Sequence, residues 1–189
     1  DNARFASVTD FLLNHHIHAP RILQRREEMG LLWVEDLGEA DLGNLEKEPW
    51  EPARRIAYES ALETVFAVHR IAESAAPDNL PELEKGFDAA LYKWEQNYFF
   101  DHYVANFGPE GSLALREDAS FSELCITLGS EPRYLVHRDF QSTNVMIRQG
   151  KSFLIDYQGL RWGLPEYDVA SMIYDPYSRF SEAEQDELA

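Results

Sequence analysis

The segment 134–156 places three oxygen-bearing side chains at fixed offsets, each close to a short apolar run. Asp139 comes three residues after the run 134–136, Asn144 directly precedes the run 145–147, and Asp156 directly follows the run 153–155. Carboxylate and amide oxygens are the ligands that Mg²⁺ prefers in proteins. The spacing therefore predicts a magnesium site at Asn144 and Asp156, with the Asp139 carboxylate left free to act as a base.

A β-hairpin is the element that would bring these side chains together. The runs 145–147 and 153–155 consist of β-branched, aromatic and other apolar residues, and Gly150-Lys151 lies between them, which is typical of two strands joined by a turn. Because the two ends of a hairpin lie side by side, we expect Asn144 and Asp156 at the same end. Asp139 is expected on the loop that leads into the hairpin.

Apolar residues at three- and four-residue spacing predict helices through much of the remaining chain. Two strands joined by a turn at Met29-Gly30 are predicted at 21–26 and 31–35. Gly129 is predicted to terminate the helix before it as a C-cap. The predicted helices cover residues 3–14, 52–73, 82–106, 113–128, 166–174 and 181–189, with a surface loop at 75–81.

Two of these helices carry residues with more than one interpretation. In helix 52–73, we expect His69 to be a hydrogen-bonded core histidine, with a role as a ligand as the alternative. It shares one face with Ile56, Ser60, Leu62, Val65 and Phe66. Helix 82–106 carries an aromatic stripe that is typical of a core, with the wall of a substrate pocket as the alternative. The stripe comprises Phe87, Leu91, Trp94, Tyr98, Phe99, His102 and Tyr103.

Composition and charge exclude several classes of partner. The chain has 34 acidic and 17 basic residues among 189, a formal charge of −17 that disfavours nucleic acid and anionic membranes and suits a cationic substrate. No run is apolar for about 18 residues and no signal peptide is recognisable. Cys125 is the single cysteine, so we expect a cytoplasmic protein. The cluster His15, His16 and His18 is interpreted as a polar helix end rather than a metal site.

Residues 137–144 read HRDFQSTN, and residues 155–158 read IDYQ. The first block resembles the His-Arg-Asp…Asn catalytic loop of the protein-kinase-like superfamily, and the second stands where that superfamily has its metal-binding aspartate. Tyr157-Gln158 replaces the Phe-Gly pair of protein kinases. The block PEYDVAS begins only nine residues after Asp156, which leaves no room for a regulatory activation segment.

These features resemble the aminoglycoside phosphotransferase/choline kinase-like family. Members carry a Pro-x-x-Asp-Leu-Ala-type helix, whose aspartate corresponds to Asp168 and braces the catalytic loop. Residues 35–38, EDLG, resemble the family's hinge, where backbone groups face adenine. Within the family, the hinge and the helix 82–106 are most similar to bacterial kinases that act on amino sugars such as N-acetylmuramate.

The resemblance implies an α+β, protein-kinase-like fold with a mostly helical C-lobe and a catalytic β-hairpin. Residues 1–38 would be a partial N-lobe and residues 39–189 a C-lobe. ATP and Mg²⁺ would be the cofactors, and a small molecule the acceptor; nothing in the sequence indicates the oligomeric state. The implied site consists of Asp139 as base, His137 and Arg138 in the catalytic loop, Asn144 and Asp156 as metal ligands, Glu35, Asp36, Leu37 and Gln158 at the cofactor, and Asp168 as brace.

Two expected features of the family are missing from the sequence. There is no Gly-rich loop, and the lysines Lys47, Lys85, Lys93 and Lys151 do not lie on a strand before the first helix, where the family has its phosphate-binding lysine. We expect that the chain is a piece that starts within the small lobe and ends within a helix, and that this fragment alone is inactive. A natural pseudokinase is the other explanation.

The sequence therefore favours a small-molecule kinase acting on a sugar or amino sugar. An aminoglycoside, choline or homoserine kinase is the alternative within the same class. A non-catalytic pseudokinase or binding module is the alternative of another class. A protein kinase is disfavoured by the short segment 156–165 and by Gln141, where Ser/Thr kinases usually have a lysine.

Overall fold

The structure is a computed structural model that describes residues 2–71 and 80–189. Its strands form three two-stranded antiparallel sheets, with the pairs β1–β2, β3–β6 and β4–β5. In the described residues, no helix has the length and apolar character needed to cross a membrane. The elements, in chain order, are α1 (Asn2–Asn14), β1 (Ile22–Arg26), β2 (Leu31–Val34), α2 (Arg55–Arg70), α3 (Ala89–Phe99), α4 (Ala105–Phe107), α5 (Ala119–Ser130), β3 (Tyr134–Val136), β4 (Val145–Arg148), β5 (Lys151–Leu154), β6 (Arg161–Gly163), α6 (Pro165–Ile173) and α7 (Glu182–Leu188).

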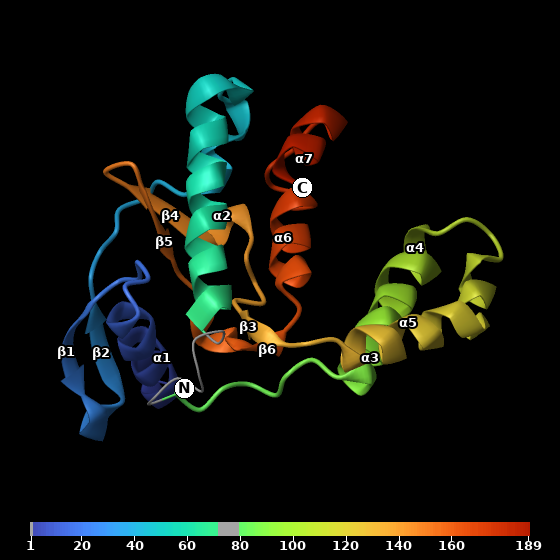
Figure 1. The fold of residues 1–189 in the computed structure, drawn as a ribbon, viewed down its shortest axis with the longest axis horizontal. Helices are drawn as coiled ribbons and strands as arrows, with labels where there is room; N and C mark the ends of the chain where they lie inside the picture. Colours follow the sequence, from blue (N-terminus) through green and yellow to red (C-terminus); the bar gives the residue numbers. More distant parts are fainter. Residues whose placement is uncertain (1, 72–79) are drawn as a thin grey trace.

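Helix α2 lies at the centre of the main body, between the β4–β5 hairpin and helices α6 and α7 (Figure 1). Its buried residues recur at three- and four-residue spacing and form the middle of the main core, together with Leu12 of α1 and with Leu135, Val145 and Leu154 of the strands. These buried α2 residues are Tyr58, Ala61, Leu62, Val65, Val68 and His69.

The predicted inward face of this helix is therefore only partly right. Ile56 and Phe66 are 56% and 40% exposed, because each is out of phase with the row that starts at Tyr58. His69 is buried, as predicted, and hydrogen-bonded to Asp168. The predicted helix end at Glu73 and most of the predicted loop 75–81 lie outside the described residues.

Helices α3, α4 and α5 form a group set apart from the main body, at one end of the molecule (Figure 1). The helix predicted from residue 82 begins only at Ala89, where the Asp88 carboxylate accepts a hydrogen bond from the Leu91 N–H as an N-cap. Residues before it extend along β6 instead, since Phe87 donates its N–H to the Trp162 carbonyl. The helix predicted from residue 113 likewise begins at Ala119, capped by Asp118.

Gly129 lies inside α5 and is not a C-cap, so that prediction is wrong. A Cβ atom at this position would lie 2.6 Å from the backbone nitrogen of Ala89 at the start of α3. Such a contact is far shorter than van der Waals distance. Glycine is therefore needed for the close approach of the two helices.

The core interpretation of the aromatic stripe is wrong for most of its members. Trp94, Tyr98, Phe99 and Tyr103 are each more than half exposed. Phe87 is buried, in a second, smaller core that α3, α5 and β3 share with Tyr92, Cys125 and Val136. The alternative, that the exposed aromatic residues line a substrate pocket, stays a prediction.

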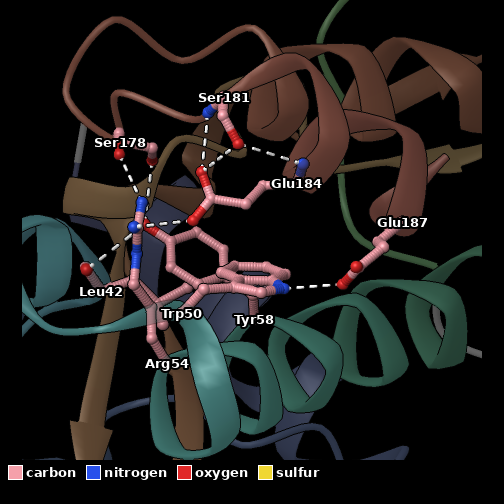
Figure 2. A network of polar contacts seen from close by, with 8 residues as sticks. All are labelled: Leu42, Trp50, Arg54, Tyr58, Ser178, Ser181, Glu184 and Glu187. Carbon is pink, nitrogen blue, oxygen red and sulfur yellow. Dashed lines mark hydrogen bonds and ion pairs between the residues drawn. The ribbon is translucent and has the colours of Figure 1, made fainter.

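A buried arginine joins the start of α2 to the segment that leads into α7 (Figure 2). Arg54 is 4% exposed, and its guanidinium lies 5.0 Å from the centroid of the Phe180 ring and 5.8 Å from that of Tyr58. It donates to the Ser178 carbonyl at 2.6 Å and pairs with Glu184 at 3.4 Å. Because this cation is both stacked and hydrogen-bonded, it holds the C-terminal helix onto the core.

Candidate active site

The hairpin β4–β5 brings two of the predicted site residues to the same end. Val145 pairs with Leu154 in the register, and the Ile155 N–H donates to the Asn144 carbonyl at 3.0 Å. Asn144 and Asp156 are therefore neighbours across the end of the hairpin, as the sequence predicted. The Asn144 side-chain amide also donates to the Asp139 carbonyl at 2.8 Å, which ties the preceding loop to the hairpin.

This arrangement fits a magnesium ion that keeps part of its coordination shell for other ligands. In the described residues, no group of three or more His, Cys, Asp or Glu side chains is positioned to hold a metal. Asn144 and Asp156 would supply two oxygen ligands, and Mg²⁺ commonly takes the others from water and substrate phosphates. The metal roles of Asn144 and Asp156 stay predictions.

The buried carboxylate of Asp168, on α6, holds the loop that carries Asp139. Its Oδ2 accepts the His137 N–H at 2.8 Å and contacts the His69 Nε2 at 2.9 Å. Its Oδ1 accepts the Arg138 N–H at 2.9 Å. These contacts fix two consecutive peptide units immediately before Asp139, which is the geometry that the predicted brace would need.

The side chain of His137 connects the same loop to the end of β5. Its Nε2 lies 3.0 Å from the Ile155 carbonyl oxygen, next to Asp156. Burial lowers the pKa of His137, against the opposing effect of the Asp168 carboxylate. His137 is thus a neutral imidazole that spans the loop and the strand, and it does not itself reach solvent.

Arg138 and Asp139, whose side chains are half-buried, form an ion pair with each other. The Arg138 Nη1 donates to Asp139 Oδ2 at 2.6 Å, and Arg138 has a left-handed backbone with a φ of 80°. The pair orients the Asp139 carboxylate by one of its oxygens and leaves Oδ1 for another ligand. This is the geometry expected of a base that must present one oxygen to a substrate hydroxyl.

The residues after Asp156 are anchored to α1. Tyr157 has no exposed surface; its hydroxyl lies 2.7 Å from the Thr9 hydroxyl and its ring stacks on Phe5. Burial raises the pKa of Tyr157 to about 12. Gln158 donates from its amide to Asp156 Oδ1, so it contacts the predicted metal ligand directly.

A cavity of about 380 Å³ adjoins the predicted hinge. It is lined on one side by residues 34–38 and on the other by Met146, Ile155 and Tyr157. In the described part of the chain, the Leu37 N–H and the Glu35 carbonyl oxygen have no hydrogen-bond partner. A mainly apolar cavity edged by a free backbone donor and acceptor suits a heterocycle such as adenine.

The carboxylates of Glu35 and Asp36, in the predicted hinge, already form contacts within the protein. The Glu35 carboxylate pairs with Arg21 at 2.9 Å and with Arg148 at 2.8 Å, and these contacts, Arg21 first, lower the pKa of Glu35 to about 2. The Asp36 carboxylate accepts the Gly38 N–H at 2.8 Å. Any cofactor contact of Glu35 or Asp36 would therefore come from the backbone and not from the carboxylate.

Two residues close to the catalytic loop were not predicted from the sequence. Tyr167 of α6 donates its hydroxyl hydrogen to Glu95 of α3 at 3.0 Å. Burial raises the pKa of Glu95, and the charges of Arg138, Arg161 and Asp139 act on it as well. Glu95 thus connects α3 to α6 and lies close enough to the loop 137–144 for the charges of Arg138 and Asp139 to act on it. A single glutamate in an aromatic-rich helix carries no spacing signal that could have revealed this.

A third residue that was not predicted, Asp175, holds the part of the loop that follows Asp139. Asp175 accepts the buried Ser142 N–H at 2.7 Å and the Tyr177 N–H at 2.8 Å. It therefore fixes the backbone between Asp139 and Asn144 in the way that Asp168 fixes the backbone before Asp139. The sequence Asp-Pro at 175–176 marks a turn, and this was the available signal.

A family model described as the phosphotransferase enzyme family matches residues 1–189. The chain belongs to this family. Its curated relatives include two N-acetylmuramate/N-acetylglucosamine kinases. The protein from Pseudomonas aeruginosa is 27% identical over 187 residues, which cover 94% of this chain and 51% of that protein. The protein from Neisseria meningitidis is 25% identical over 170 residues, 88% of this chain and 49% of that protein.

Solved structures of the same fold cover almost the whole chain. The choline kinase LicA from Streptococcus pneumoniae matches with a TM-score of 0.63 at 15% identity, over 100% of this chain and 60% of that one. The ADP-bound aminoglycoside phosphotransferase APH(2'')-Ib matches with a TM-score of 0.64 at 14% identity, over 98% and 64%. The predicted α+β, protein-kinase-like fold is confirmed. The chain spans about half the length of the curated relatives it matches.

Proposed function

We propose that the protein containing this chain is an ATP- and Mg²⁺-dependent kinase that phosphorylates a hydroxyl group of an amino sugar. The observation that carries the proposal is the meeting of Asp139, Asn144 and Asp156 at one end of the β4–β5 hairpin, beside the hinge cavity. The names of the curated relatives support an amino sugar as the acceptor.

In this proposal, the nucleotide base occupies the cavity beside residues 35–38. The free N–H of Leu37 and the carbonyl oxygen of Glu35 would bind its edge, and Met146 and Ile155 would cover one face. Asn144 and Asp156 would hold Mg²⁺, and Gln158 would orient Asp156. The metal ion supplies positive charge that stabilises the phosphate oxygens during transfer.

Asp139 would receive the proton of the acceptor hydroxyl. As the acceptor oxygen forms its bond to the γ-phosphorus, the bond between that phosphorus and the bridging oxygen of ADP breaks, and the hydroxyl proton passes to the carboxylate. The Arg138 ion pair leaves Oδ1 of Asp139 available for this contact. Catalysis then depends mainly on positioning, which Asp168, His137 and Asp175 provide.

We further propose that residues 1–38 form part of a small lobe and residues 39–189 part of a large lobe, with the hinge cavity between them. Neither β1 nor β2 carries a lysine. Because the chain spans about half the length of its curated relatives, the proposal concerns the full-length gene product. Use of ATP and the single cysteine favour the cytoplasm as the place of action.

The test is a coupled ADP-release assay of the full-length gene product with amino sugars, aminoglycosides, choline and homoserine. We expect turnover with amino sugars and a loss of at least about 100-fold in kcat for Asp139→Asn, with ATP affinity retained. Asp186→Asn, an exposed aspartate of α7, is the matched control. Normal turnover of Asp139→Asn would refute the base assignment, and activity only on another acceptor class would refute the amino sugar.

A further inference from the structure

Arg161 lies on β6, which pairs with β3, the strand that leads into the loop 137–144. On β6 it pairs with Val136, the residue directly before His137. Its Nε donates to the Gly159 carbonyl at 3.0 Å. Gly159 in turn lies against the base, since a Cβ atom built on it would be 3.7 Å from Asp139 Oδ2. The Arg161 side chain is therefore attached to the backbone that borders the Asp139 carboxylate.

The guanidinium of Arg161 has no carboxylate partner in the described part of the chain. The two carboxylates whose charges act on Arg161 are paired with other arginines, Asp139 with Arg138 and Glu84 with Arg4. Arg161 instead lies over the Phe87 ring, 5.5 Å from its centroid. It is half-buried in a protein with twice as many acidic as basic residues, 34 against 17.

A half-buried cation without a counter-ion is unfavourable. Burial and the like charge of Arg138 both lower the pKa of Arg161, and Glu84 and Asp139 only partly offset them. The Arg161 guanidinium, unpaired and close to the proposed base Asp139, is therefore suited to bind an anionic group of a ligand. Among the described residues, Glu84 and Asp139 act on Arg161 without forming an ion pair with it, and each is paired with another arginine.

Arg161 lies outside the lining of the hinge cavity, in surroundings that we assign to the acceptor. The charges that act on it belong to Arg138, Glu84, Asp139 and Tyr167, and Tyr167 is bonded to Glu95 of α3. The hinge cavity is lined by other residues, from α1, the hinge and the β4–β5 hairpin. A ligand anion bound by Arg161 would thus lie outside the cavity proposed for the nucleotide base, next to the backbone that borders Asp139.

We propose that Arg161 binds a carboxylate carried by the acceptor and makes the enzyme prefer an anionic amino sugar over a neutral one. The inference rests on the function proposed above and specifies its acceptor. N-acetylmuramate carries a lactyl carboxylate that N-acetylglucosamine lacks, so the two sugars form a matched pair of acceptors. A guanidinium–carboxylate pair in a half-buried site discriminates strongly between them.

The experiment compares both sugars as acceptors of the full-length wild-type enzyme and of Arg161→Gln. We expect kcat/KM for N-acetylmuramate to fall at least about tenfold in the variant. We expect kcat/KM for N-acetylglucosamine and KM for ATP to stay within about twofold. Arg116→Gln is the control, because Arg116 also lies over a phenylalanine ring, 5.4 Å from the Phe100 centroid, but is paired with Asp101 and donates to the Asn97 carbonyl of α3.

Four results would overturn parts of this interpretation. An equal loss with both sugars together with a raised KM for ATP would assign Arg161 to the transferred phosphate and refute the acceptor role. If the folded variant keeps the wild-type ratio of kcat/KM for N-acetylmuramate to kcat/KM for N-acetylglucosamine, this inference alone is refuted. If the wild-type enzyme is inactive on both sugars, the proposed function is refuted as well. If Arg161→Gln does not fold, the methyl ester of N-acetylmuramate tests the wild type: an ester as good as the acid would refute the inference.

Discussion

Asp168 has no exposed surface, and three nitrogen atoms converge on its two carboxylate oxygens. Two of these belong to the backbone that leads into Asp139, so the position of this proposed base depends on a residue 29 positions further along the chain. A buried acceptor that serves several donors cannot be replaced by a group with fewer acceptor sites without leaving a donor unpaired.

Asp168→Asn should therefore lower both stability and turnover. The amide keeps the shape of the side chain, but its NH₂ group would face an N–H donor, and we expect a loss of about 2–4 kcal/mol in the free energy of unfolding. Urea denaturation of wild type and variant measures this loss, and Asp186→Asn again serves as the exposed control. A change below about 0.5 kcal/mol would show that the three contacts do not hold the loop.

At the residue scale, spacing was the useful signal. Asp139, Asn144 and Asp156 could be predicted because short apolar runs on either side fix their offsets in a hairpin. Glu95 and Arg161 could not, because each reaches the loop only through the packing of α3 and β6 against it. Tertiary contacts of this kind leave no periodic trace in the sequence.

At the element scale, the predicted helices were right in type and wrong at several ends. The helices predicted from residues 82 and 113 start at Ala89 and Ala119, because Asp88 and Asp118 accept backbone hydrogen bonds as N-caps. The residues before Asp88 also pair with β6. Helical spacing alone cannot reveal such pairing, because the same apolar residues pack in either conformation.

Gly129→Ala tests the packing of α3 on α5. A new Cβ atom 2.6 Å from the Ala89 nitrogen would force the two helices apart, and we expect a loss of about 1–3 kcal/mol despite the better helix propensity of alanine. Ser130→Ala is the control, since Ser130 is the next residue of the same helix and is exposed. Thermal unfolding of both variants measures the difference, and a stabilised Gly129→Ala would contradict the close approach.

At the scale of the whole molecule, the Glu35 carboxylate connects three parts of the chain. It pairs with Arg21 before β1 and with Arg148 at the end of β4, so it joins the β1–β2 sheet to the β4–β5 hairpin. The pKa of Glu35 is lowered to about 2, and the pairing therefore stabilises the folded state at neutral pH. That stabilisation should be lost as the pH falls through the range from about 4.5 to about 2.

Glu35→Gln should accordingly be less stable than wild type by about 1–2 kcal/mol at pH 7, with the difference shrinking below about pH 4.5. Chemical denaturation at pH 7, 4 and 3 measures this at about constant ionic strength. Glu39→Gln, an exposed residue just after the hinge, should show no such trend. A difference that is the same at every pH would mean that Glu35 acts through packing and not through its charge.

The family and the fold could be predicted from a small part of the chain. The block 134–171 carries the specific motifs, and the solved structures of the same fold confirm the architecture around it. The exposed state of Trp94, Tyr98 and Tyr103 could not be foreseen, because the sequence shows which residues are apolar but not what covers them.

Tyr157 also bears on the design of inhibitors. A compound that bound only after this ring left its site would have to break a buried hydrogen bond to Thr9 and a stack on Phe5, and would expose an aromatic ring that is now fully covered. That displacement costs several kcal/mol, roughly 3–5 by analogy with removing a large core side chain, and it would be subtracted from the affinity of any such compound. Ligands that occupy the hinge cavity as it stands avoid this penalty, and they are the better starting point for medicinal chemistry.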